Sequence, residues 1–327
     1  MNIEELYNQR PDLALAKLIG EPINTQFPVP VEITEIADTF TAVAGEHIWR
    51  YSSLDTTADV ILAVDANGYL VDVRRSPLSD VEVSFISLNS KLERVGLDAI
   101  LGSPDVDLLA RRKQSIMRGM DKREVKLILD AILGKTAGYV PGTSVQEYTV
   151  ASATDLYDAV MGMKHLVEDY GDNYILLVGS TVSNAIDTYD KDQVGSFNYR
   201  IGLKETFRSL GIEVRKIFGQ VSSVTGETEA SLMDSKKMIL IAKDSRISEG
   251  KPIKFVRRLI DPRVAEAAGL SVDNAQRAIA AVPLPVSVDV AGTSTNTLDY
   301  GVVGYESIIF LITNPYAIVI ADMNLVL

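Results

Sequence analysis

Residues 58–75 read ADVILAVDANGYLVDVRR, two apolar strand-like runs joined by Asn67-Gly68. Asn-Gly supplies the two positive-φ residues of a type I′ turn, so this stretch predicts a two-stranded antiparallel hairpin. With those two residues as the loop, one face of the ribbon is apolar and the other is mixed, with Ile61 opposite Arg74. The apolar face consists of Leu62, Val64, Val71 and Val73. An isolated ribbon of two strands is marginally stable in water, so its apolar face must be covered by another surface.

The segment before the hairpin, residues 1–44, is predicted to be an arm. After a short helical opening at residues 3–19 come Pro22, Pro28 and Pro30, with apolar residues between them. Proline fixes φ and removes a hydrogen-bond donor, which predicts an extended strap in place of a helix. Two partners for this strap remain open: the core of its own chain, or the surface of another copy.

A strand and a long helix follow the hairpin. Residues 81–86 alternate between apolar and polar side chains, which predicts a strand returning to the body. Ser103 and Pro104 form a helix start, and Gly134 is the expected stop after Leu133. A helix over residues 103–133 would be about 46 Å long.

Basic residues are concentrated on this helix, although the chain as a whole is acidic. The candidates for contact with another molecule are Arg111, Arg112, Arg118 and Arg123, accompanied by Lys113, Lys122 and Lys126. A solvated or salt-bridged helix face is the ordinary explanation for such a cluster. The alternative is that these residues pair with an acidic surface on a neighbouring copy.

The rest of the chain mixes helices and short buried strands. Helices are predicted at residues 156–169, 181–189 and 204–210, and strands at 174–178, 212–217 and 237–242. Further strands are predicted at 252–260, 302–313 and 316–321. This order gives an α+β chain whose α/β region has a core of its own.

Composition excludes several kinds of function. The chain has 327 residues, no cysteine and a net charge of −12. Tight nucleic-acid binding is not expected, because phosphate contacts need a basic footprint. The acidic start and the absence of a long apolar run predict a soluble, cytoplasmic protein with no membrane partner. No catalytic or metal-binding pattern is found, so we expect no enzyme activity and no cofactor. The one candidate anion site is Gly179-Ser180, at the start of a predicted helix.

The order of arm, long hairpin, long helix and α/β region resembles the major capsid proteins of tailed bacteriophages, which have the HK97-like fold. The resemblance rests on the order and size of the elements. It implies an N-terminal arm at residues 1–44 and an extended hairpin, the E-loop, at 45–85. It further implies a peripheral domain with a spine helix at 86–153, with strands from 253–315, and an axial domain at 154–252, with a final strand at 316–327.

The resemblance also implies partners and a location. Copies of the chain would form hexamers and pentamers of an icosahedral shell, assembled in the host cytoplasm, that encloses double-stranded DNA without binding it tightly. A separate scaffold, portal or decoration protein is a further candidate partner. No lysine lies between Lys17 and Lys91, so an isopeptide crosslink from the E-loop is not expected. Two alternatives stay open: an encapsulin-like nanocompartment shell, and an oligomeric α/β enzyme with its site near Gly179-Ser180.

Overall fold

The computed structural model describes most of the chain, in two compact units. The described residues are 29–46, 48–54, 78–90, 93–96, 108–134, 145–150, 156–192, 202–222, 229–245, 250–261, 271–274, 276–290 and 293–323. The chain crosses between the units five times, and two of the crossings fall inside helix α5 (Leu108–Ile132) and strand β15 (Thr293–Ile312). The first unit contains residues 87–122 and 258–307, and the second contains 30–86, 123–257 and 308–327.

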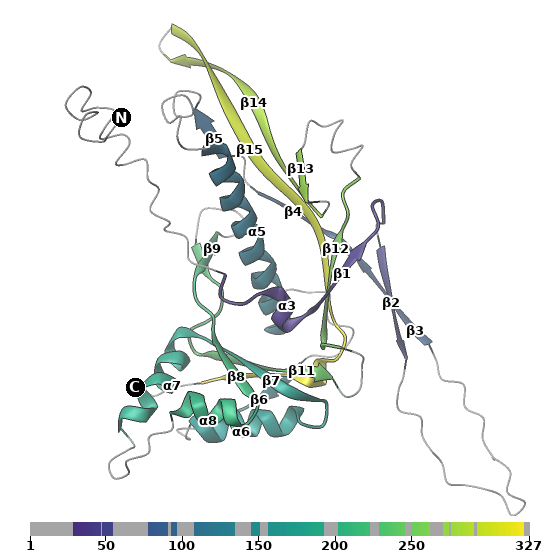
Figure 1. The fold of residues 1–327 in the computed structure, drawn as a ribbon, viewed down its shortest axis with the longest axis vertical. Helices are drawn as coiled ribbons and strands as arrows, with labels where there is room; N and C mark the ends of the chain where they lie inside the picture. The colour runs from purple at the N-terminus through teal and green to yellow at the C-terminus, as the bar shows by residue number, and fades with distance from the viewer. Residues whose placement is uncertain are drawn as a thin grey trace, which may run out of the picture. The chain divides into compact units, whose positions relative to one another are not determined.

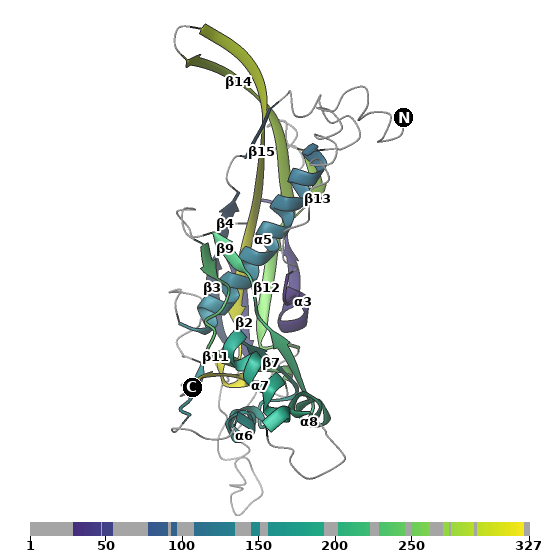
Figure 2. The same cartoon turned by 90° about the vertical axis from the view of Figure 1, so that its left-hand side faces the viewer.

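The sheet of the first unit is built on a long antiparallel pair of strands. Strand β14 (Arg277–Val290) pairs with β15 from Arg277↔Glu306 to Val290↔Thr293. The two strands lie side by side in both views (Figures 1 and 2). Three short strands complete this part of the sheet: β13 (Ser271–Asn274) on β14, and β4 (Ile86–Asn89) and β5 (Glu93–Gly96) on β15.

Strand β14 runs through Pro283 and Pro285, a strand that the local sequence pattern does not predict. Proline is tolerated in a strand only where its missing N–H is not needed by a neighbour. The register of β13 with β14 ends at Ile279. Both prolines lie beyond that point, where β15 is the partner of β14 among the described strands.

Helix α5 confirms the long helix predicted from the sequence, although the expected start at Ser103 lies outside the described residues. It ends as predicted: Gly134 has φ +68°, and its N–H donates to Ala131 O at 3.0 Å. In the first unit the helix packs through Ile116 and Met120 on β14 and β15. A Cβ on Gly304 of β15 would lie 2.6 Å from Ile116 Cγ2, so glycine is what lets the helix approach the sheet.

The second unit contains a five-stranded mixed sheet. Its strand order is β6-β16-β11-β7-β8. The strands are β6 (Gln146–Tyr148), β16 (Ile318–Asp322), β11 (Lys237–Ser245), β7 (Gly171–Val178) and β8 (Ile212–Lys216). The strands predicted at 174–178, 212–217 and 237–242 are thereby confirmed.

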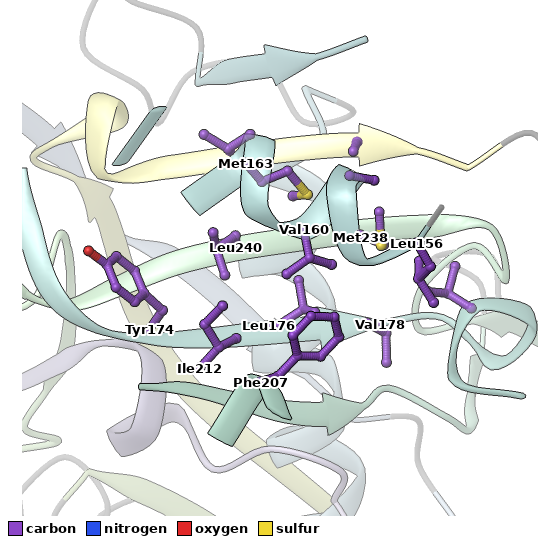
Figure 3. Close-up of a cluster of buried hydrophobic side chains, with 14 of the residues drawn as sticks. Leu156, Val160, Met163, Tyr174, Leu176, Val178, Phe207, Ile212, Met238 and Leu240 are labelled. Atoms are coloured by element: carbon purple, nitrogen blue, oxygen red, sulfur yellow. The ribbon is translucent and has the colours of Figure 1, made fainter. Parts of the chain in front are cut away.

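Three helices cover one face of this sheet: α6 (Leu156–Val167), α7 (Ser180–Asp192) and α8 (Leu203–Ser209). Figure 3 shows the core between them, where Val160, Met163 and Phe207 meet alternate residues of the strands, such as Leu176 and Leu240. All five of these side chains are fully buried. The α/β region predicted from the sequence therefore has the separate core that was expected.

The described end of the arm packs on its own chain. Residues 33–36 form a single helical turn, α3 (Ile33–Ile36), and β1 (Asp38–Ala42) follows as a strand beside β12 (Ile253–Arg258). Val31 and Ile36 are each 1% exposed. Of the two partners left open for the arm, its own core is the one found for these residues. The helical turn differs from the predicted extended strap because burial of the apolar side chains overrides the local pattern.

The root of the hairpin is a regular antiparallel ladder in the second unit. Strands β2 (Ile48–Leu54) and β3 (Leu78–Ser84) pair from Ile48↔Ser84 to Leu54↔Leu78 without a break in register. The strand predicted at 81–86 is confirmed in β3 and β4. The unit also holds the small pair β9 (Gln220–Ser222) and β10 (Glu229–Ser231) and the 3-10 turn η1 (Pro315–Ala317).

Candidate assembly surfaces

The predicted contact residues of the hairpin tip lie outside the described residues. This applies to Leu62, Val64, Asn67, Gly68, Val71 and Val73. The root of the same hairpin is described, and it is fixed to its own body. Val83 is 7% exposed and packs, with half-buried Trp49, on Val256 and Ile309 of the neighbouring sheet.

The two faces of the root differ in their surroundings. Successive side chains of a strand point to opposite faces, so Trp49 and its cross-strand partner Val83 share the face that packs on the body. Ile48 and its partner Ser84 share the other face, and both are exposed. At these positions the ladder is anchored on one side, and its other side is open to solvent.

The basic residues of α5 are divided between surface and interior. Arg111, Arg112 and Arg118 are exposed, whereas Arg123 is half-buried. Lys126 is turned toward its own chain, where its Nζ donates to Asp130 Oδ1 at 2.9 Å and to Leu232 O at 3.2 Å.

Residues seven apart on a helix lie on one stripe, so the guanidinium groups of Arg111 and Arg118 extend from the same side of α5. Both are exposed, and they form a cationic stripe on a chain of net charge −12. Such a stripe can pair with carboxylates of another molecule.

In the first unit an acidic side chain of α5 forms an ion pair within its own chain. Asp121 Oδ1 lies 2.7 Å from Arg277 Nη2, and Arg277 Nε donates to Glu306 Oε2 at 2.5 Å. Glu306 is fully buried and is the cross-strand partner of Arg277. The ion pair between Asp121 and Arg277 links α5 to strands β14 and β15.

In the second unit Glu124, one turn further along α5, makes a comparable interaction. Arg257 Nε and Nη2 donate to its two carboxylate oxygens at 2.9 and 2.7 Å. Glu124 is fully buried, so this bidentate pair is a structural element of the interior. Asp121 and Glu124 thus pair with arginines of the sheet strands, while Arg111, Arg112 and Arg118 are exposed. Sequence reasoning missed both pairs, because nothing local distinguishes a buried carboxylate from a surface one.

Two groups of exposed apolar side chains were also missed. The first surrounds the turn between β1 and β2: Phe40 is 46% exposed, Val43 64% and Ile48 47%. We call these three residues the root patch, because they lie at the root of the hairpin. The second lies beside the five-stranded sheet, where Tyr316 is 47% exposed and stacks on Tyr170 with ring centroids 5.5 Å apart.

The alternative anion site at Gly179-Ser180 is not supported by the geometry. The N–H groups of Thr181 and Val182, at the start of α7, donate to Ser235 O at 3.1 and 3.4 Å. A Cβ on Gly179 would collide with main-chain oxygens of the same loop. These two N–H groups at the start of α7 are therefore occupied by the chain's own backbone, which argues against the alternative of an anion site at Gly179-Ser180.

Among the described residues, no group of histidine and acidic side chains has the arrangement of a metal site. No helix among the described residues combines the length and apolar character needed to cross a membrane.

Comparison with known proteins gives a fold and no close relative. No protein-family model and no curated protein matches the sequence. Among solved structures, the capsid of a native GTA particle matches with a TM-score of 0.59 and 12% identity, covering 93% of each chain. The mature capsid of bacteriophage PhiM1 matches with a TM-score of 0.54 and 11% identity, covering 94% of this chain and 91% of the other. The chain has the HK97-like fold.

The HK97-like fold confirms the α+β fold class predicted from the order of the elements. A further match, to the holo-SrpI encapsulin complex of Synechococcus elongatus PCC 7942, has a TM-score of 0.46 at 14% identity, covering 95% of this chain and 94% of the other. That likeness is too distant to carry an argument. At identities of 11 and 12% the two stronger matches establish the fold alone.

Proposed function

We propose that this chain is the major capsid protein of a tailed bacteriophage, and that its copies assemble into an icosahedral shell of hexamers and pentamers. The observation that carries the proposal is the HK97-like fold, which is matched over more than nine-tenths of the chain by proteins of two assembled capsids. The closed contacts of such a shell are heterologous, so different surfaces of the subunit must meet around each axis.

The parts of the chain take on roles in this proposal. Residues 1–44 are the N-terminal arm and 45–85 the E-loop. Residues 86–153, with strands from 253–315, are the peripheral domain that α5 supports as its spine helix. Residues 154–252 are the axial domain, joined by the final strand. The five-stranded sheet supports the last assignment, since β16 lies between β6 and β11.

The hairpin is the principal contact between subunits. Its root is packed on the body through Trp49 and Val83. The apolar face predicted for Leu62, Val64, Val71 and Val73 lies beyond that root in the sequence. A ribbon anchored at one end and apolar at the other suits a strap that buries its tip on a neighbour, with packing and backbone hydrogen bonds as the forces.

The second contact is electrostatic. The exposed guanidinium groups of Arg111, Arg112 and Arg118 pair with acidic surface on an adjacent copy, and half-buried Arg123 is a further candidate contact. Exposed ion pairs contribute little affinity individually but orient the partners.

The shell encloses double-stranded DNA without holding it tightly. A net charge of −12 suits a container wall to which packaged DNA does not adhere. The shell is the capsid of a virion, assembled in the host cytoplasm, with a separate scaffold, portal or decoration protein as a further partner. The subunit has no catalytic role in this proposal.

The proposal is tested by assembly of the purified chain and of hairpin variants. Val64→Asp/Val71→Asp places two charges on the predicted apolar face and should leave a folded subunit that forms no particles. Ile61→Asp is the control, because it adds a charge opposite Arg74 on the mixed face and should still assemble. Light scattering gives the particle size, and far-ultraviolet circular dichroism gives the fold of each subunit.

Two results contradict the proposal. A wild-type chain that remains a small discrete oligomer is not a shell protein, and a double variant that unfolds has a hairpin that packs on its own body. The contents of the particles then distinguish a viral capsid from a nanocompartment shell. Nuclease-protected DNA indicates a virus, whereas enclosed protein without DNA indicates an encapsulin-like nanocompartment.

A further inference from the structure

A cluster of hydrogen-bonding groups surrounds the hydroxyl of Tyr305 in the first unit. Arg258, the last residue of β12, donates from Nη2 to the Tyr305 hydroxyl oxygen at 3.3 Å. Ser87 Oγ, on β4, lies 3.4 Å from the same oxygen. The three residues come from three different strands, so the fold and not the local sequence brings them together.

Ser307 adds a buried hydroxyl to this cluster. It lies two residues beyond Tyr305 on β15, so its side chain points to the same face of the sheet. Ser307 is 1% exposed, and its Oγ has no hydrogen-bond partner of normal geometry among the described residues. Buried hydroxyl groups are nearly always hydrogen-bonded in proteins. An unpaired hydroxyl beside an arginine therefore points to a ligand that supplies acceptor atoms.

The cluster favours negative charge at the Tyr305 hydroxyl. Burial by itself would raise the pKa of this phenol, but the hydrogen bond with Ser87 and the charge and hydrogen bond of Arg258 outweigh it. Together they lower the pKa of Tyr305 below its ordinary 10.0, and Ser307 acts in the same direction. Groups that stabilise a phenolate also stabilise an anion that binds beside them.

The neighbours of Tyr305 on the sheet do not oppose an anion. Its cross-strand partner on β14 is Ala278, which is neutral. The adjacent Glu306 points to the opposite face and is bonded to Arg277. Ser87 is exposed and Tyr305 is only half-buried, so a ligand from solvent can reach the donors.

We propose that this cluster binds one phosphate group, with the guanidinium of Arg258 as the cation and the hydroxyls of Tyr305 and Ser87 as further donors. A phosphate group presents three or more acceptor oxygens in different directions, whereas a carboxylate presents two in one plane. Donors that come from separate strands suit the phosphate better. The site goes beyond the proposed shell function, which does not require it.

The number of charges limits how tightly the phosphate is held. One arginine is far from the basic footprint that a tight grip on duplex DNA needs. The site therefore takes single phosphate groups weakly, in keeping with a chain of net charge −12. Such a group comes either from the backbone of enclosed DNA or from free phosphate in solution.

Titration of the unassembled full-length subunit with inorganic phosphate tests the site. The subunit carries isotope-labelled tyrosine, is studied by NMR and is kept at constant ionic strength. One tyrosine signal should shift in a saturable way, and that signal should be missing from Tyr305→Phe. Bound phosphate should also raise the pKa of Tyr305, because a second negative charge disfavours the phenolate.

Arginine variants measure the contribution of the cation. Arg258→Met should weaken phosphate binding about tenfold or more, because it removes a charge-assisted hydrogen bond. Arg208→Met is the matched control, since Arg208 is exposed on α8 in the second unit, and should bind phosphate as the wild type does. Tyr170→Phe should likewise leave binding unchanged.

Each outcome decides for or against the site. A shift in a tyrosine other than Tyr305, a response that sodium chloride reproduces, or unchanged affinity in Arg258→Met overturns the proposal. If Arg258→Met is unfolded by circular dichroism, Ser87→Ala at an exposed position decides: weaker binding supports the site and unchanged binding overturns it. Displacement of phosphate by duplex DNA would identify the DNA backbone as the source, and no displacement would identify free phosphate. The subunit is unassembled throughout, so a failure to form particles leaves this test unaffected.

Discussion

Replacing Arg257 with methionine should destabilise the subunit by about 3–5 kcal/mol, because it removes the cation that pairs with a fully buried carboxyl group. Glu124 is fully buried, and both of its carboxylate oxygens accept hydrogen bonds from Arg257, at 2.9 and 2.7 Å. Methionine keeps much of the side-chain volume and removes the charge and the donors. The loss of stability therefore reports the removal of the charged partner and not the opening of a cavity.

Substitution of the other member of the pair, Glu124, should destabilise the subunit less. Glu124→Gln leaves the guanidinium of Arg257 unpaired, but the Arg257 side chain is 23% exposed and water can solvate it. One hydrogen bond to the amide oxygen also survives, so about 1–3 kcal/mol is expected. Lys237→Met is the control, since its pair with Asp322 lies at the surface, with exposures of 26 and 45%, and should cost no more than about 1 kcal/mol.

Urea unfolding of the unassembled subunit, isolated by size exclusion, measures these differences. Trp49 is the single tryptophan of the chain and lies in the same unit as Arg257, so its fluorescence reports unfolding of that unit. The loss of unfolding free energy should be largest for Arg257→Met, smaller for Glu124→Gln and smallest for Lys237→Met. If Glu124→Gln costs as much as Arg257→Met or more, the reasoning from the buried carboxylate is wrong.

Four further perturbations have distinct expected results. Gly179→Ala should lower the thermal midpoint by the equivalent of about 1–3 kcal/mol, because its Cβ meets main-chain oxygens. Gly119→Ala, at an exposed position of α5 with open space around it, should raise the thermal midpoint by the equivalent of up to about 1 kcal/mol in the free energy of unfolding. A hydrogen bond from Lys243 lowers the pKa of Glu213 below its ordinary 4.5, so this pair stabilises the fold above that pH and the stabilisation is lost as pH falls through the lowered pKa. In acid titrations monitored by circular dichroism, Lys243→Met should lose less stability on acidification than the wild type does. Equal losses in the two proteins would contradict a stabilising role for the Lys243–Glu213 pair. Arg118→Glu should reduce the assembled fraction seen by light scattering at low salt, with the difference shrinking at high salt; a difference independent of salt would exclude an electrostatic contact.

Elements with a strong local pattern could be predicted from the sequence. The end of α5 at Gly134 follows from glycine's access to positive φ, which the structure shows at +68°. The buried strands around Leu176 and Leu240 are continuous apolar runs bounded by polar residues. The order of these elements was enough to identify the HK97-like fold.

Features that depend on distant partners could not be predicted. The helical turn at Ile33–Ile36 forms because its apolar side chains find a core that is built from later parts of the chain. Strand β14 crosses Pro283 and Pro285 because β15 supplies its ladder there. The root patch was missed for the same reason, since the exposure of Phe40 and Val43 is set by what packs around them and not by their neighbours in sequence.

Electron microscopy of the purified chain under assembly conditions tests the central claim most directly. The HK97-like fold, the anchored hairpin root and the open apolar patch together predict closed particles of uniform diameter, tens of nanometres across, with pentameric and hexameric clusters in their walls. A monomer or a small discrete oligomer across the same range of concentration and salt would contradict the account.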